Sequence, residues 1–545
     1  MPALSRREFV QVAAATGLAS VAPLALSASP SPLPPVPTPP PFDLEEITVA
    51  QLQAGLASGR YTSRRLCEAY LARVAQVDAR GPTLRSVIET NPDALAIADR
   101  TDAERRAGRS RGPLHGIPVL IKDNIATGDR MKTTAGSLAL ADASAPRDAF
   151  IARKLRDAGA VIIGKTNLSE WANFRSSHSV SGWSGRGGQC RNPYALDRSP
   201  CGSSSGTGAA ISANLAAVGV GTETDGSIIC PSGANSLVGI KPTLGLVSRR
   251  GIIPIAHSQD TAGPMARTVA DAAVLLGVLA GPDPEDPATV DAGTRGQTDY
   301  TAALDPNGLR GARIGVARAV FGTSAVADRL VNAAIDVLKA QGAVIVDPAD
   351  IPHMNDYGDA ESTVLHYEFK ADVNAYLAGL GSGASMKTLA DLIAYNEQHK
   401  DQEMPYFGQE TFLKAQEKGS LSDDAYIEAL AHCRRLSRTE GLDKLFADQP
   451  LDAIVMPTGD PPWLIDLVNG DCGGGGATSP AAVSGYPSIT VPVGYGFGLP
   501  VGISFVGKAW SEPTLIKLAY AYEQAAKPRR PPRFLATATL DRATE

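Results

Sequence analysis

Residues 148–163 run Asp148-Ala-Phe-Ile-Ala-Arg-Lys-Leu-Arg-Asp-Ala-Gly-Ala-Val-Ile-Ile163. This passage predicts a helix over 149–158, capped by Asp148 and closed by Gly159, and then a buried strand over 160–163. The same order recurs further on, where an alanine-rich helix over 207–217 precedes a short strand at 218–221. Strands that are apolar throughout and alternate with helices are typical of sheets with both faces covered. The pattern therefore predicts an α/β core.

One large domain accounts for most of the 545 residues. Its expected limits are 43–526, and within them strand-like apolar runs begin near 116 and return at 451–457 and 486–492. Between about 350 and 445 the pattern is mostly helical and more charged, which indicates a helical insertion packed on the core. No internal repeat is visible at solenoid periods.

The two ends of the chain differ in composition from this domain. An Arg6-Arg7 pair precedes a mild apolar stretch over 12–26, so residues 1–27 are predicted to be an export signal of the twin-arginine type. Eight prolines between 30 and 41 make 28–42 a stiff tether, and 527–545 is left as a C-terminal tail. We therefore expect a periplasmic or secreted protein.

Composition excludes several classes of function. Lys and Arg total 51 against 57 Asp and Glu, a net charge of −6, which excludes a generally basic nucleic-acid binder. No interior stretch has the roughly 20 apolar residues that span a bilayer. None of the six cysteines forms a C-x-x-C pair, so metal-site spacing is absent and the sequence leaves their pairing open, with buried free thiols as the alternative.

Two segments match the residue patterns of known functional motifs, but the residues around them do not form the secondary structure that those motifs require. Residues 159–166 satisfy the P-loop pattern with Lys165 and Thr166, but the four middle residues, Ala-Val-Ile-Ile, favour a buried strand over a phosphate-wrapping loop. Residues 202–206 satisfy G-x-S-x-G with Ser204, but the polar residues 197–201 before them are not the required strand. None of the seven histidines has the sequence context of a catalytic base.

A different set of residues indicates catalysis. Lys122 directly follows the apolar run 116–121, and burial at a strand end disfavours a charged lysine, which would leave a neutral amine able to act as a base. Downstream lies a Gly/Ser-rich segment with Ser203, and 24 residues later Ser227 stands in Gly221-Thr-Glu-Thr-Asp-Gly-Ser-Ile228.

These residues, together with 240–243 and 258–264, resemble the amidase signature hydrolases. The resemblance implies an amidase-signature fold, a large mixed and mostly parallel sheet covered by helices on both faces. It implies a Ser-Ser-Lys triad in which Lys122 is the base, Ser203 the relay and Ser227 the nucleophile. The oxyanion hole would be the backbone N–H groups of Thr224, Asp225, Gly226 and Ser227. It also implies a cis bond between Gly202 and Ser203, no cofactor and no metal.

Within that family the motifs are most similar to bacterial peptide amidases. Two departures from the general pattern stand out: Cys201 replaces a glycine before the first serine, and Ile229 stands where many members carry arginine. Arginine is the natural partner of a substrate carboxylate, so its absence favours substrates without a free acid beside the amide, such as C-terminal peptide amides. The alternatives are an aliphatic or aryl amidase and a glutaminase-like subunit that supplies ammonia for transamidation. We expect a monomer acting on a small amide or peptide.

Overall fold

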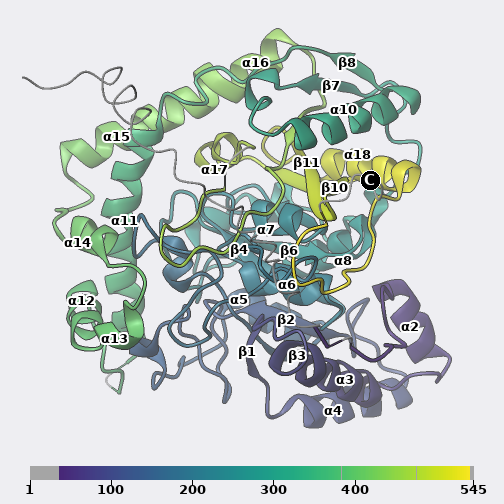
Figure 1. Ribbon diagram of the computed structural model, residues 1–545, viewed down its shortest axis with the longest axis vertical. Coiled ribbons are helices and arrows are strands. Elements are labelled where there is room, and N and C mark those ends of the chain that lie inside the picture. The colour runs from purple at the N-terminus through teal and green to yellow at the C-terminus, as the bar shows by residue number, and fades with distance from the viewer. Residues whose placement is uncertain (1–35, 38, 382, 474–475, 540–545) are drawn as a thin grey trace, which may run out of the picture. The chain divides into compact units, whose positions relative to one another are not determined.

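An eleven-stranded mixed sheet organises the computed structural model, which describes residues 36–37, 39–381, 383–473 and 476–539 (Figure 1). Its strand order is β1-β3-β2-β4-β6-β5-β10-β11-β9-β7-β8. The strands are β1 (Val87–Thr90), β2 (Pro118–Lys122), β3 (Val161–Thr166), β4 (Val218–Glu223), β5 (Val238–Lys241), β6 (Thr261–Ala266), β7 (Arg313–Val316), β8 (Val344–Val346), β9 (Ala453–Pro457), β10 (Ser488–Gly496) and β11 (Leu499–Val506).

The predicted mixed sheet is confirmed, but the expectation of mostly parallel strands is wrong. Strands β3-β2-β4 and β9-β7-β8 are parallel, whereas the centre of the sheet and the β1–β3 pair are antiparallel. One cause is the hairpin β10–β11, whose two-residue loop, Phe497-Gly498, has positive φ at both positions (56° and 75°). Such a tight turn joins only antiparallel strands.

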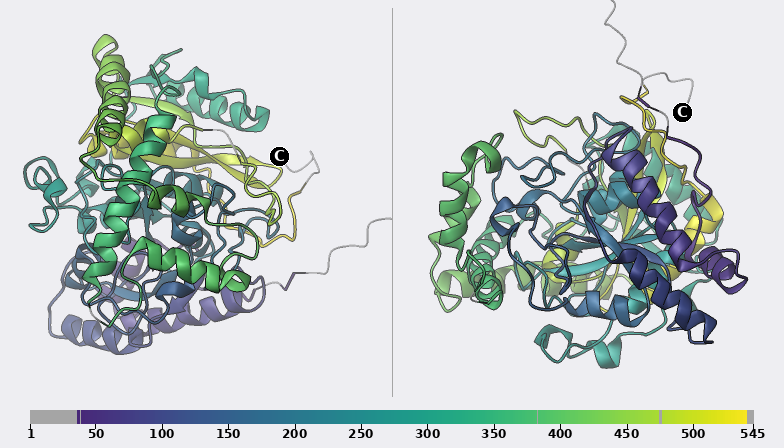
Figure 2. Two further views of the ribbon diagram at one scale, coloured as in Figure 1. Left: turned by 90° about the vertical axis from the view of Figure 1, so that its left-hand side faces the viewer. Right: turned by 90° about the horizontal axis from the view of Figure 1, so that it is seen from below.

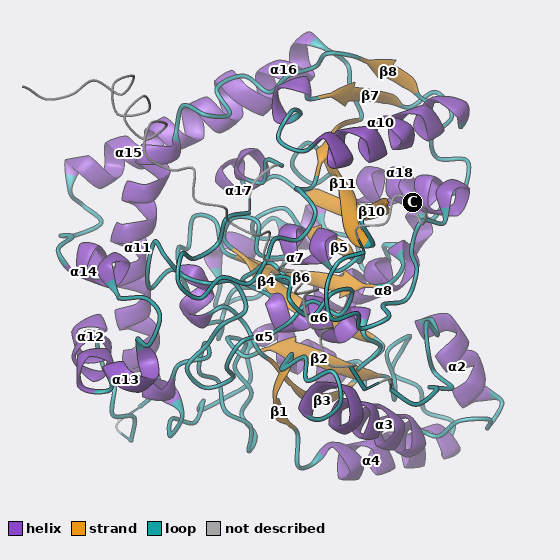
Figure 3. Cartoon of the chain, in the orientation of Figure 1, coloured by secondary structure: helices purple, strands orange, loops and turns teal. Residues whose placement is uncertain are grey.

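Helices lie around this sheet (Figure 3). Contacts pair α5 with β3, α6 with β4, α8 with β6 and α18 with β10. Outside the insertion the helices are α2 (Val49–Ala57), α3 (Ser63–Arg73), α4 (Ala94–Arg106), α5 (Phe150–Asp157), α6 (Ser205–Ser212), α7 (Ile229–Ala234), α8 (Val269–Leu279), α9 (Ala292–Arg295), α10 (Ala325–Ala340), α17 (Ser479–Ser484) and α18 (Glu512–Ala526).

The passage around α5 folds nearly as expected. The strand after it forms as β3, and Gly159 ends the helix with a φ of 76°. Its N-cap, however, is Ala149, because the Asp148 carboxylate instead accepts a hydrogen bond from the Gly128 N–H (2.8 Å) and pairs with Arg156 (3.0 Å). Asp148 therefore links the start of α5 to Gly128 and Arg156 instead of capping the helix.

Residues 350–445 contain helices throughout. The helices here are α11 (Gly358–Gly379), α12 (Leu389–Gln398), α13 (Lys400–Glu403), α14 (Glu410–Gln416), α15 (Asp424–Arg434) and, at the far end, α16 (Asp443–Asp448). The right-hand view of Figure 2 shows green helices of this region along one edge of the ribbon, away from the purple N-terminal helices. Buried polar contacts fasten them to the core, for example the Glu403 carboxylate, which accepts hydrogen bonds from Ser137 Oγ (3.1 Å) and the Leu138 N–H (2.6 Å).

The two ends of the described chain pack on the core. The predicted export signal, 1–27, lies outside the described residues. Phe42, at the end of the predicted tether, makes an edge contact with the Tyr70 ring, and Arg529, in the predicted tail, forms a partly buried ion pair with Glu46 (2.7 Å). Of the helices described, none is long and apolar enough to cross a membrane.

Candidate active site

Lys122, the predicted base, is the last residue of β2 and has no exposed surface. Its Nζ donates hydrogen bonds to Ser203 Oγ (2.7 Å), Thr222 Oγ1 (2.9 Å) and the Thr222 carbonyl (3.3 Å). Burial lowers the pKa of Lys122 to about 7, although the Asp260 and Glu223 carboxylates oppose the shift. The lysine is therefore poised between its charged and neutral forms near neutral pH.

The three contacts of Nζ suit a neutral amine as well as an ammonium. Such an amine has two N–H donors and one lone pair. The two oxygens of Thr222 can accept both N–H groups, which leaves the lone pair directed at the Ser203 hydroxyl. Thr222 Oγ1 is itself held by Asn124 Nδ2 at 2.9 Å. Lys122 and Ser203 are thus brought together as predicted.

Ser203 lies just before α6 and is fully buried. The Gly202–Ser203 peptide bond is cis, as the resemblance implies. Gly202 has no room for a Cβ atom, because the Ser169 hydroxyl occupies that space. The next residue, Ser204, donates its N–H to the Ser227 carbonyl (3.2 Å), so the two serine segments are hydrogen-bonded to each other through their backbones.

Ser227 lies in the loop between β4 and α7 and is 7% exposed. A buried carboxylate shapes this loop: Glu223 Oε2 accepts hydrogen bonds from the N–H groups of Ile228 (2.7 Å) and Ile229 (3.0 Å). Within the described chain, the hydroxyls of Ser203 and Ser227 make no hydrogen bond to each other. Such contacts are commonly long when no substrate is bound.

The predicted oxyanion donors lie in the same loop. No hydrogen bond within the described residues uses the backbone N–H groups of Asp225, Gly226 or Ser227. Thr224 anchors the loop, since its hydroxyl donates to Asp260 Oδ1 (2.6 Å). The Asp225 carboxylate accepts a hydrogen bond from Ser479 Oγ (2.5 Å). The loop is therefore held by side chains while three of its N–H groups are left free for a ligand.

Sequence reasoning missed four residues that support this site. Asn124 and Thr222 hold Lys122, and Glu223 and Asp260 hold the loop that carries Ser227. Three of them lie within two residues of a predicted site residue, so proximity in sequence was the available signal. Asp260 belongs to the 258–264 motif, but only the fold shows that it reaches Thr224 from just before β6.

One disulfide, Cys201–Cys230, joins the two serine-bearing segments. The sequence left the pairing open, and the structure selects this pair. The remaining cysteines are free: Cys67, Cys190 and Cys433 are buried, and Cys472 is exposed.

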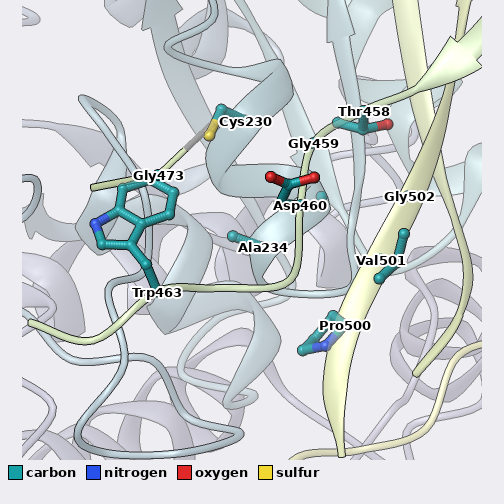
Figure 4. A pocket seen from close by; sticks show the side chains of 11 residues that line it. Cys230, Ala234, Thr458, Gly459, Asp460, Trp463, Gly473, Pro500, Val501 and Gly502 are labelled. Carbon is teal, nitrogen blue, oxygen red and sulfur yellow. The ribbon is translucent and has the colours of Figure 1, made fainter. Parts of the chain in front are cut away.

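Two cavities lie close to these elements. One, of about 400 Å³, is lined by Asn124, Thr222 and Thr224 and also by Arg249 and His257. The other, of about 120 Å³, lies beside α7 and is lined by Cys230 together with Asp460 and Trp463 (Figure 4).

Comparisons with known proteins show the family and the fold. The family model for amidases matches residues 65–516. Two crystal structures of peptide amidase, one a complex with the competitive inhibitor chymostatin and the other the native enzyme of Stenotrophomonas maltophilia, are each 54% identical in sequence. Their TM-scores are 0.88 and 0.87, and the matches cover 90% and 91% of this chain and all of theirs.

Curated relatives extend across 88–91% of the chain. A probable amidase of Arabidopsis thaliana is 42% identical over 504 residues, which are 91% of this chain and 93% of the plant protein. One component of the glutamyl-tRNA(Gln) amidotransferase of Chloroflexus aurantiacus is 36% identical over 498 residues, or 88% and 97% of the two chains. Because the family match spans most of its length, the chain belongs to the amidase family of amide hydrolases.

Proposed function

We propose that this amidase cleaves carboxamides to a carboxylate and ammonia through an acyl-enzyme formed on Ser227. The observation that carries the proposal is the 2.7 Å contact between the buried Lys122 Nζ and Ser203 Oγ. Neutral Lys122 takes the proton of Ser203, and Ser203 takes the proton of Ser227 as its Oγ attacks the amide carbonyl. No metal or cofactor takes part in these steps.

The tetrahedral intermediate carries its negative charge on the former carbonyl oxygen. The free N–H groups of Asp225, Gly226 and Ser227 are available to bind it, with Thr224 at the start of the same loop. Donors of this kind are worth roughly 100- to 1,000-fold in rate each. The relay then runs backwards to protonate the leaving ammonia, and water, activated by the same relay, releases the acid.

The proposed substrates are C-terminal amides of peptides. Support comes from the 54% identity to peptide amidases and from Ile229, which is 1% exposed where many family members carry arginine. An apolar side chain offers no ion pair to a substrate carboxylate, and a C-terminal carboxamide has no such carboxylate beside the scissile bond.

The test is ammonia release from peptide amides, aryl amides, aliphatic amides and free asparagine or glutamine. We expect kcat/KM to be highest for peptide amides. Ser227→Ala should lower kcat by at least roughly 10⁴-fold. A matched control is Ser362→Ala on α11, an exposed serine far along the chain from the triad, which should retain full activity. Preference for an aryl or aliphatic amide would replace the peptide-amide proposal with that rival.

A second candidate is an ammonia-supplying component of a transamidation complex, favoured by the 36% identity to the amidotransferase component. Such a component would co-purify with partner chains and hydrolyse glutamine. Gel filtration of the protein from its native source separates the two candidates: we expect a monomer with no stoichiometric partner.

We also propose export to the periplasm or the medium, on the strength of Arg6 and Arg7 ahead of the apolar stretch 12–26. Cell fractionation of the full chain tests it. Replacing both arginines by lysine should retain the protein in the cytoplasm, and unchanged export of that variant would contradict a twin-arginine route.

A further inference from the structure

The disulfide occupies a distinctive position relative to the triad. Cys201 lies two residues before Ser203, and Cys230 lies three residues after Ser227. Their Cα atoms are 6.0 Å apart. Cys230 is fixed relative to the nucleophile loop, because its N–H donates to the Gly226 carbonyl at 2.8 Å. The bridge therefore connects the relay segment to the nucleophile segment by a short covalent path.

The backbone at Cys201 favours a smaller residue than cysteine. Its φ is 56°, in the left-handed region that glycine adopts without steric cost. Ser199 Oγ accepts a hydrogen bond from the Cys201 N–H (3.1 Å), and the Cys201 carbonyl accepts one from Ser205 Oγ (2.6 Å). Cys201 thus has a side chain in a backbone conformation that favours glycine, and that side chain is bonded to the segment with Ser227. This combination points to a role for the bridge itself.

Hydrogen bonds also hold the two segments: Ser204 Oγ donates to the Thr222 carbonyl (3.0 Å), and Asn235 Nδ2 donates to the Pro200 carbonyl (2.8 Å). The backbone hydrogen bond from Ser204 to Ser227 ties the segments on one side, and the hydroxyls themselves are not hydrogen-bonded to each other. We infer that the Cys201–Cys230 disulfide is a positioning element that holds Ser203 and Ser227 in register for proton transfer, and that its reduction reversibly lowers turnover. This inference rests on the proposed Ser-Ser-Lys mechanism.

The bridge is within reach of a reductant. Cys230 lines the cavity of about 120 Å³ beside α7, with Trp463 and Asp460 around it (Figure 4). A dithiol entering there would transfer two electrons and two protons. One of its thiolates attacks a bridge sulfur, the S–S bond breaks, and the second thiol closes the reductant's own disulfide, leaving Cys201 and Cys230 as free thiols.

The experiment compares the full-length wild type with Cys201→Ser, Cys230→Ser and the double variant. We expect all three to lower kcat for a peptide amide by a similar roughly 10- to 100-fold, with KM changed by less than about threefold, because misplaced reacting groups slow the chemical step. Dithiothreitol should do the same to the wild type, and reoxidation with oxidised glutathione should restore kcat.

A second readout does not depend on the amide chosen. A fluorophosphonate phosphonylates an activated serine, so its rate of reaction with Ser227, followed by mass spectrometry, should fall in parallel with kcat. If wild-type Ser227 is labelled but peptide amides release no ammonia, the substrate proposal fails and the labelling rates still test the bridge. If labelling modifies no serine of the triad, the mechanism itself fails.

The matched control is Cys472→Ser, which removes an exposed free thiol and should change neither kcat nor the response to dithiothreitol. Loss of the response in that variant would assign it to Cys472 and overturn the inference. A fall in the melting temperature of the bridge variants, with kcat and labelling rate at wild-type values, would also overturn the inference. The bridge would then only stabilise the fold.

Discussion

The ends of the neighbouring strands β2 and β3 each carry a fully buried lysine, Lys122 and Lys165. Burial lowers the pKa of both, to about 7 and about 8. Their partners differ. Lys165 Nζ donates to the carbonyls of Ile125 (2.8 Å) and Lys132 (3.0 Å) and to Thr133 Oγ1 (2.9 Å), so all three protons of an ammonium find acceptors.

Lys122 instead faces Ser203, whose hydroxyl can give up a proton, and the two oxygens of Thr222. Nearby carboxylates favour the charged form of both lysines, Asp123 for Lys165 and Asp260 with Glu223 for Lys122. Burial alone therefore does not make a lysine a base. The contacts differ in kind: two of the three acceptors around Lys165 are carbonyl oxygens, whereas Lys122 contacts two hydroxyls, one of them that of Ser203, the proposed proton relay.

The largest contrast should come from replacing each lysine by methionine. Lys122→Met should lower kcat by roughly 10³- to 10⁴-fold, since it removes a general base. Lys165→Met should keep kcat within about threefold but lower the free energy of unfolding by about 1–3 kcal/mol for each buried acceptor that it leaves without a donor, such as the carbonyls of Ile125 and Lys132. Ammonia release and urea denaturation measure the two effects. Full activity in Lys122→Met would remove it from the mechanism.

A smaller loss is expected when the proton-donating partner is removed. Ser203→Ala should lower kcat by roughly 10²- to 10³-fold, less than Ser227→Ala, because a water molecule can take the place of the missing hydroxyl. Far-UV circular dichroism should match the wild type. Turnover by Ser203→Ala at the wild-type rate would show that Lys122 activates Ser227 without it.

The pH dependence of turnover follows from the lowered pKa of Lys122. Only the neutral amine accepts a proton, so kcat/KM should fall about 10-fold per pH unit below a midpoint near 7. Above that midpoint the lysine is neutral and the acid limb flattens. A rate that stays constant from pH 5.5 to 8 would contradict the assignment, because Lys122 would have to be neutral or uninvolved throughout.

The smallest effect concerns the two threonines that contact the lysines. Thr222→Val removes an acceptor that favours the ammonium form, so the acid limb should shift to lower pH and kcat should fall by roughly 3- to 10-fold. Thr133→Val makes the same change beside Lys165 and should leave the pH profile in place. Equal shifts of the acid limb in Thr222→Val and Thr133→Val would mean that the pH profile does not report on Lys122 alone.

Much of the site could be predicted from the sequence. Lys122 follows a run of apolar residues, Ser203 and Ser227 stand in short motifs with fixed spacing, and the strand at 160–163 and the helix before it follow from local hydrophobic patterns. The cis bond before Ser203 also agrees with the family resemblance. The helix and the strand depend on neighbours in the chain, so one sequence suffices to predict them, whereas the roles of the three residues and the cis bond were implied by the resemblance.

The tertiary structure decided the rest. It paired Cys201 with Cys230, made the centre of the sheet antiparallel, and gave Lys122 and Lys165 different partners. Lys122 meets Ser203 across 81 positions of sequence. Sheet direction, disulfide pairing and the pKa of a buried amine all depend on which groups lie within a few ångströms in space, and residues so far apart in the chain meet only when the whole sheet has formed.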